Sequence, residues 1–213
     1  MANGGNSRDL SALVESLYRQ SRCAMEQGSL DIAIAKARDA FDLAAEEMQA
    51  RPRNNSINTW INALVPYSEV RLKRDPHDED ALRDLIEGEL AARKLTSEFE
   101  KFDTYRRALS RCLLLRAKYA DAAGSHQMLT EIIGILSPVL KRSKALRYKT
   151  VLVDAYIQRA SLPGINQETA IADLATAAEL QAMITDAIPD DVREKQKLAE
   201  LRKQLDGLRS DSD

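Results

Sequence analysis

The chain has 213 residues, and its 31 basic and 33 acidic side chains give a formal net charge of −2. It contains only 8 glycines and 6 prolines, and aromatic residues make up 5% of it, whereas 44% is hydrophobic and 30% is charged. So few turn-forming and strand-forming residues argue against a β-sandwich, a β-barrel and a disordered linker. The balanced charge gives no general attraction to nucleic acid or to acidic membranes.

The cysteines and the N-terminal segment indicate the cellular compartment in which the protein is expected. Cys23 and Cys112 have no metal-binding spacing, and we expect both to act as small apolar residues of helices, although the sequence leaves a disulfide between them open. The N-terminus lacks the basic flank and apolar run of a signal peptide, and no run of about 18 apolar residues could span a membrane. The sequence therefore predicts a cytoplasmic protein without a membrane partner, with the nucleus as the second candidate compartment.

In the first part of the chain, apolar residues recur every three or four positions. This spacing predicts helices over residues 8–27 and 30–50, with Ser7 as N-cap of the first. Gly28 lies between them, where glycine can adopt the left-handed conformation that ends a helix, and Pro52 follows the second. We therefore expect a helical hairpin with almost no loop.

Caps and prolines predict the boundaries of the middle helices. A third helix is expected after the caps at 54–56, with Trp60 packed rather than exposed, and Pro66 should kink or split it. Asp75 and Pro76 have the order of an N-cap followed by proline at the first helical position. Further helices are expected at about 77–95, 103–120, 125–136 and 144–160, with a break at Gly124 and a break or bend at Pro138.

The last two helices are expected at 169–187 and 191–208, after a loop at 161–167. We interpret 190–209 as a C-terminal capping helix, because a stacked helical array otherwise leaves the apolar face of its last unit in water. The same helix also fits one strand of a dimeric coiled coil, so the sequence leaves a homodimer open. Its narrow apolar stripe consists of Leu198, Leu201, Leu205 and Leu208.

Small residues mark the predicted hairpin where its two helices would touch. They are Ser21 and Ala24 on the first helix and Ala33 and Ala40 on the second, with Gly28 at the turn. In this pattern the segment 17–44 resembles the tetratricopeptide repeat (TPR) family. The resemblance implies an all-α fold, a right-handed superhelical array of antiparallel helix hairpins known as a TPR-like α-solenoid, and a role in protein–protein interaction.

The rest of the chain matches this pattern only in part, and residues 52–103 match it poorly, so any repeats are degenerate. We expect one TPR-like helical repeat domain over residues 8–189. Residues 1–7 would form a flexible N-terminus, and residues 210–213 a frayed tail.

The sequence contains no catalytic constellation. His77 and His126 have no cysteine or histidine at metal-binding spacing, so we expect surface or capping roles for them. No serine lies in a nucleophile motif, and no glycine-rich phosphate-binding loop occurs. The acidic clusters at 78–80 and 98–103 fit the first turns or exposed faces of helices. We therefore predict a protein that is not an enzyme and has no cofactor or metal.

Two groups of basic residues are candidate binding segments. If the hairpins stack, they can converge on a surface suited to an acidic or phosphorylated peptide or to nucleic acid, and otherwise they form a solvated face balanced by acids. Few aromatic residues lie nearby to stack on bases, which disfavours nucleic acid. The groups are Arg106, Arg107, Arg111, Arg116 and Lys118, and Lys141, Arg142, Lys144, Arg147 and Lys149.

Chaperone-binding members of the TPR family hold a C-terminal carboxylate with lysine and asparagine on the first helices of the repeats. The corresponding face here offers different residues, so we do not transfer that activity. We predict instead an adaptor that binds a peptide or protein subunit in a concave groove lined by its first helices. The alternatives are a nucleic-acid-associated protein using the basic segments 106–118 and 141–149, or a structural subunit of a larger complex. The candidate partner-binding residues are Tyr18, Arg22, Met25, Arg111, Lys118, Lys141, Arg142 and Lys144.

Overall fold

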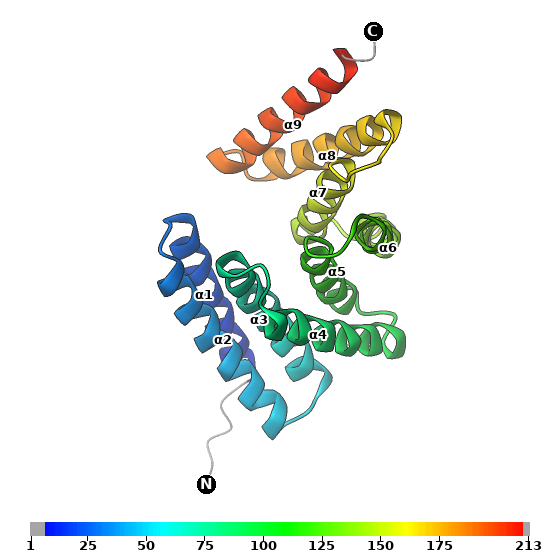
Figure 1. The fold of residues 1–213 in the computed structure, drawn as a ribbon. Helices are drawn as coiled ribbons and strands as arrows, with labels where there is room; N and C mark the ends of the chain where they lie inside the picture. The colour runs from blue at the N-terminus through cyan, green and yellow to red at the C-terminus, as the bar shows by residue number, and fades with distance from the viewer. Residues whose placement is uncertain (1–6, 211–213) are drawn as a thin grey trace. The chain divides into compact units, whose positions relative to one another are not determined.

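The computed structural model describes residues 7–210, of which 84% are helical and none lies in a strand. The predicted all-α class is confirmed. Within this range the helices are α1 (Ser7–Glu26), α2 (Leu30–Ala50), α3 (Asn54–Arg74), α4 (Glu79–Glu98), α5 (Asp103–Ala117), α6 (Ala122–Leu140), α7 (Leu146–Ala160), α8 (Gln167–Ala187) and α9 (Val192–Ser210) (Figure 1). The flexible ends predicted at 1–7 and 210–213 lie outside the described residues, except for Ser7 and Ser210, which are helical.

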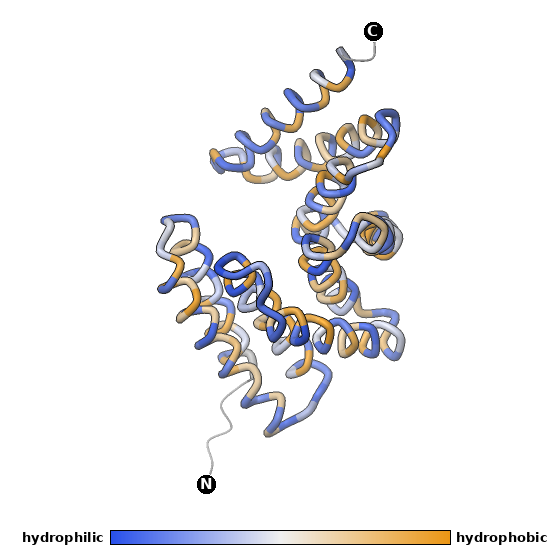
Figure 2. Tube along the Cα trace, viewed as in Figure 1, coloured by the Kyte–Doolittle hydropathy of each residue, from blue (hydrophilic) through white to orange (hydrophobic). Residues whose placement is uncertain are grey.

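The chain divides into two compact units, Met1–Leu115 and Arg116–Asp213, so that α5 ends in the second unit. In the first unit α1 packs against α2 and α3, α2 against α3, and α3 against α4. In the second unit α6 packs against α7, α7 against α8, and α8 against α9. The α1–α2 and α8–α9 pairs, joined by short connections, run antiparallel as hairpins of helical repeats do, whereas α6 is seen end-on beside α7 (Figure 1). Hydrophobic and hydrophilic residues alternate every few positions along the helices, which matches burial of one side (Figure 2).

The α1–α2 hairpin is closely packed because α2 presents a row of alanines. Ala33, Ala37, Ala40 and Ala44 are each no more than 1% exposed. The small side chains allow the backbones to approach, and Ser21 Oγ of α1 donates a hydrogen bond of 2.7 Å to the Ala33 carbonyl of α2. Gly28 turns the chain with φ of 76°, a conformation that glycine adopts without a steric penalty. The hairpin predicted from the alanine and glycine spacing is confirmed.

Helix α3 runs without interruption from Asn54 to Arg74, so of the two expected effects of Pro66, a kink or a split, the split is wrong. Proline removes one backbone donor, but Pro66 is buried between core residues, and their packing outweighs one lost hydrogen bond. Trp60 in the same helix is 6% exposed, which confirms its packing role. Because Pro66 has no N–H, the carbonyl of Asn62 loses its usual donor within the helix.

Three predicted helix boundaries differ in the structure, two of them because another residue acts as the cap. Asp78, rather than Asp75, caps α4, since its Oδ1 accepts a hydrogen bond of 2.9 Å from the Ala81 N–H. Asp121 caps α6 in the same way through the N–H of Gly124, which therefore lies in the first turn of α6 rather than between two helices. Pro138 likewise lies within the last turn of α6 instead of ending it.

Helices α3, α4 and α5 meet closely at Gly88. A Cβ atom at this position would lie 2.5 Å from Leu64 Cδ2 and 3.8 Å from Cys112 Sγ. Cys112 is buried, as expected, whereas Cys23 is exposed, and neither forms a disulfide. The core of the second unit includes the fully buried residues Leu129, Ile132, Leu136 and Leu152.

Candidate functional site

Side chains from α1, α3 and α5 meet on one face of the first unit. Arg111 Nη1 of α5 donates a hydrogen bond of 3.0 Å to Asn62 Oδ1 of α3. The Arg111 guanidinium carbon also lies 5.7 Å from the centroid of the Tyr18 ring of α1, within cation–π distance. Tyr18 and Arg111 were both predicted partner-binding residues, and the structure brings them into contact although they are far apart in the sequence.

Helix α3 carries more asparagines on this face. Asn55 and Asn58 precede Asn62 by about two turns and one turn, so helical periodicity places all three on the same side of α3. Helix α1 packs directly against α3, and Ser11 Oγ lies 3.3 Å from Thr59 Oγ1 across that contact. We call this surface the first-helix face and define it as Tyr18, Asn55, Asn58, Asn62 and Arg111.

The asparagines of α3 are unfavourable for the helix itself. Asparagine forms helices poorly, because its side chain competes for nearby backbone groups. Here Asn62 Nδ2 donates to the Asn58 carbonyl at 2.7 Å, while Asn58 Oδ1 is buried and receives no hydrogen bond from the described residues. The Asn62 carbonyl also loses its usual helical donor, because residue 66 is a proline. A local departure from helix propensity of this kind is typical of functional surfaces.

The other candidate residues of the first unit have local partners. Arg22 is exposed and pairs with Glu26 of the same helix, with 3.1 Å between Nε and Oε1. Met25 is partly buried and packs against the alanine core between α1, α2 and α3. Neither residue contacts Arg111 in the way that Tyr18 does. A partner-binding role for Arg22 and Met25 therefore stays a prediction.

The remaining candidates belong to the second unit and are exposed. Lys118 follows the end of α5, whereas Lys141, Arg142 and Lys144 lie in the connection between α6 and α7. The Arg142 guanidinium donates to the Pro138 carbonyl at 3.4 Å. Their binding role also stays a prediction.

Other members of the two basic groups contact neighbours in their own segment. Arg106 bonds the Asp103 carboxylate at 3.1 Å and the Glu100 carbonyl. Arg147 lies over the Tyr148 ring at 5.1 Å. Arg106 and Arg147 therefore stabilise their own segments through these contacts.

No group of three or more histidine, cysteine, aspartate or glutamate side chains among residues 7–210 is arranged to hold a metal ion. In the same range no helix combines the length and the apolar character of a membrane span. His77 and His126 are exposed, in agreement with their predicted surface positions.

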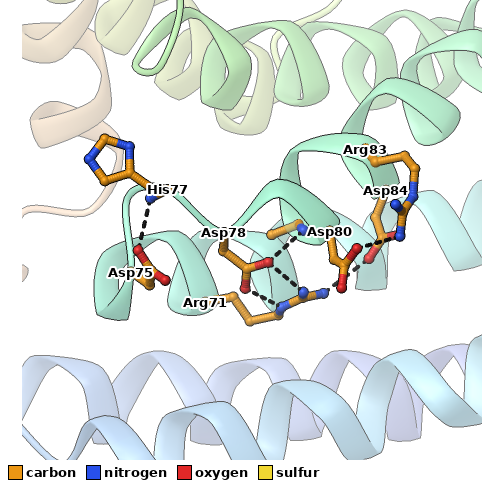
Figure 3. Close-up of polar contacts among 8 residues, drawn as sticks. Arg71, Asp75, His77, Asp78, Asp80, Arg83 and Asp84 are labelled. Carbon is orange, nitrogen blue, oxygen red and sulfur yellow. Dashed lines mark hydrogen bonds and ion pairs between the residues drawn. The ribbon is translucent and has the colours of Figure 1, made fainter.

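A polar cluster at the α3–α4 turn joins these helices (Figure 3). Arg71 Nε and Nη2 bond both oxygens of Asp78, at 2.8 and 2.7 Å, and its Nη1 bonds Asp84 at 3.0 Å. Burial alone would raise the pKa of Asp78, but the hydrogen bonds from Arg71 and from the Ala81 N–H outweigh it, so the pKa lies below its ordinary value. The Arg71 guanidinium and the carboxylates of Asp78 and Asp84 thus form hydrogen bonds with one another within the turn, which indicates a structural role.

Asp78→Ala should lower the free energy of unfolding by about 1–2 kcal/mol near pH 7, since it removes both a helix cap and a charged hydrogen bond. Because the pKa of Asp78 is lower in the folded protein than in the unfolded one, its contribution is complete above about pH 4 and is lost as the pH falls further. Urea unfolding at neutral and acidic pH measures the difference. Asp80→Ala, at an exposed pair with Arg83, is the control and should cost less than about 0.5 kcal/mol. An Asp78→Ala penalty that is equal at both pH values would contradict this assignment.

Comparison with known proteins adds information on the fold. No protein-family model matches the sequence, and no curated protein matches it. Among solved structures, the chain is similar to Nro1, described as a hypoxic regulator of sterol synthesis and a nuclear import adaptor, with a TM-score of 0.54 and 11% identity over 95% of this chain and 75% of that one. It is also similar to the de novo designed helical repeat protein DHR64, with a TM-score of 0.37 and 20% identity over 96% of this chain and 100% of that one. At this level of identity the likeness to Nro1 concerns the fold alone, an all-α, solenoid-like array of helices.

Proposed function

We propose that this chain is a non-enzymatic adaptor of the tetratricopeptide type, and that its first-helix face binds a partner protein. The observation that carries the proposal is the contact of Tyr18, Asn62 and Arg111, which come from three different helices. A stacked array of hairpins holds such side chains in place before binding, so less conformational entropy is lost when a partner docks. The buried Ala33 and Ala40 of the α1–α2 hairpin support the repeat type.

The composition of the face suits a protein partner. Tyrosine and arginine are enriched among the residues that contribute most to binding energy at protein interfaces. An asparagine side chain carries both a donor and an acceptor, so it can pair with the main chain of a bound segment. Nro1, which shares the fold, is described as an adaptor, and this agrees with the proposed class.

Photo-crosslinking tests the proposal. A photoreactive phenylalanine analogue is placed at Asn55, an exposed position of the first-helix face, and in a second variant at Glu87, an exposed position of α4. After irradiation in native lysate, we expect discrete protein adducts at position 55 and none at position 87. Gel electrophoresis and mass spectrometry measure the adducts.

Two outcomes would contradict this result. Adducts at position 55 that disappear on nuclease treatment would favour the nucleic-acid-associated protein. Equal discrete adducts at both positions would favour a structural subunit enclosed on several faces by a larger complex.

A further inference from the structure

Arg111 differs from three other partly buried arginines whose carboxylate partners are known. Arg71, Arg106 and Arg159 each have a nitrogen within 3.1 Å of a carboxylate oxygen. Arg111 is also partly buried, but its contacts are the ring of Tyr18 and the amide of Asn62, and neither group carries a charge. No carboxylate among the described residues contacts its guanidinium.

This arrangement fixes the guanidinium without neutralising it. A charge that is partly withdrawn from water loses hydration, and a ring quadrupole and one amide oxygen recover only part of that loss. Nη1 is the only nitrogen of Arg111 that has a hydrogen-bond acceptor among the described residues. The remaining N–H groups form the planar fork that binds a carboxylate with two parallel hydrogen bonds.

The neighbouring asparagines bear on the source of the anion. Asn55 of this face is exposed, so the oxygen of its side-chain amide is an acceptor that a partner can reach. A phosphate ion offers no N–H donor, whereas a peptide offers backbone N–H groups beside an acidic side chain. Arg111 lies over one face of the Tyr18 ring, which leaves at most the other face to stack on a nucleotide base.

We propose that the first-helix face recognises an acidic segment of the partner, with Arg111 binding an aspartate or glutamate carboxylate. Asn62 and Tyr18 are positioning residues that hold the guanidinium. This inference rests on the proposed function, since it specifies the partner chemistry of the same face.

Asn62→Asp tests the inference, because it places a carboxylate where Asn62 Oδ1 now lies, 3.0 Å from Arg111 Nη1. The new carboxylate neutralises Arg111 and competes with the ligand, at little change in side-chain volume. The probe is an acetylated, amidated hexaglutamate peptide with a fluorescent label, titrated with the full chain at low ionic strength and followed by anisotropy. We expect the affinity to fall by about 10- to 100-fold.

Two control variants change the net charge equally without touching Arg111. Asn166→Asp retains the cap of α8, where Asn166 Oδ1 accepts from the Thr169 N–H, because aspartate caps helices as well as asparagine does. It should leave the affinity within about twofold of the original value.

A second test variant, Arg111→Gln, should weaken binding as strongly as Asn62→Asp. Its control is Arg83→Gln, at an exposed arginine of α4, which should have little effect.

The inference is overturned if hexaglutamate binds no better than hexaglutamine, or if Asn62→Asp binds hexaglutamate like the original protein. Binding of single-stranded oligouridine that Arg111→Gln abolishes, without binding of hexaglutamate, also overturns it in favour of nucleic acid. If hexaglutamate fails but position 55 yields protein adducts, only the acidic chemistry is wrong. If position 55 yields no protein adduct, the proposed function itself fails.

Discussion

Replacing Arg159 with alanine is expected to lower the free energy of unfolding by about 3–5 kcal/mol. Arg159 of α7 holds Asp173 of α8 with two hydrogen bonds, Nε to Oδ2 at 2.8 Å and Nη2 to Oδ1 at 2.6 Å. The hydrogen bond to Asp173 outweighs burial and raises the pKa of Arg159, so the guanidinium stays charged at ordinary pH. Because Asp173 is only 3% exposed, loss of its counter-charge leaves a buried carboxylate without compensation.

Chemical denaturation measures this effect, and two variants control it. Arg38→Ala removes an exposed pair with Asp42 at 3.6 Å and should cost less than about 0.5 kcal/mol. Adding Asp173→Asn to Arg159→Ala should restore part of the stability, because the isolated charge is then gone. A cost for Arg159→Ala as small as that of Arg38→Ala would show that the pair contributes little.

Deleting residues 190–213 is the second change with a large expected effect. Helix α9 packs on α8, and the fully buried Gln181 of α8 donates to Glu194 Oε2 at 2.6 Å. Leu201 and Leu205 of α9 are 2% and 7% exposed. Without α9 the apolar side of α8 would meet water, so we expect a lower melting temperature and self-association, measured by thermal unfolding and light scattering.

Leu201→Asp gives a milder form of the same test and should cost more than about 2 kcal/mol. The matched control is Ala199→Asp, which introduces the same side chain at an exposed position of α9. A truncated chain that stays monomeric and melts unchanged would remove the proposed capping role. A full-length dimer that truncation converts to a monomer would favour the coiled-coil interpretation instead.

The sequence predicts the helices well because their signals are local. The spacing of apolar residues repeats within single helices. Gly28 and Gly164, which the structure shows at positive φ, each lie in the turn of a single hairpin. The errors occur where two local signals compete. Asp75 precedes a proline and Asp78 does not, yet Asp78 caps α4, because Arg71 fixes its carboxylate from the preceding helix. No pattern in the sequence reveals that contact.

The candidate site was predicted only in part, for the same physical reason. Tyr18 and Arg111 were identified as members of the first helices, but their contact depends on how α1, α3 and α5 pack. Asn62 was missed because asparagine in a sequence usually indicates a cap or a turn. The frequency of asparagine within α3, at positions where no cap is needed, is the signal that could have found it.

The packing of each helix against its neighbours in the sequence also has a consequence for how the chain folds. Within each unit, nearly all helix pairs in contact are consecutive, from α1 and α2 to α8 and α9. Such a topology has a low contact order, so little loop-closure entropy is lost before contacts form, and folding is expected to be fast. The α1–α2 hairpin has a further advantage, since the alanines at its interface lose no rotamer entropy on burial. Folding can therefore start in this hairpin during synthesis, before Arg111, the residue that completes the first-helix face, has been added to the chain.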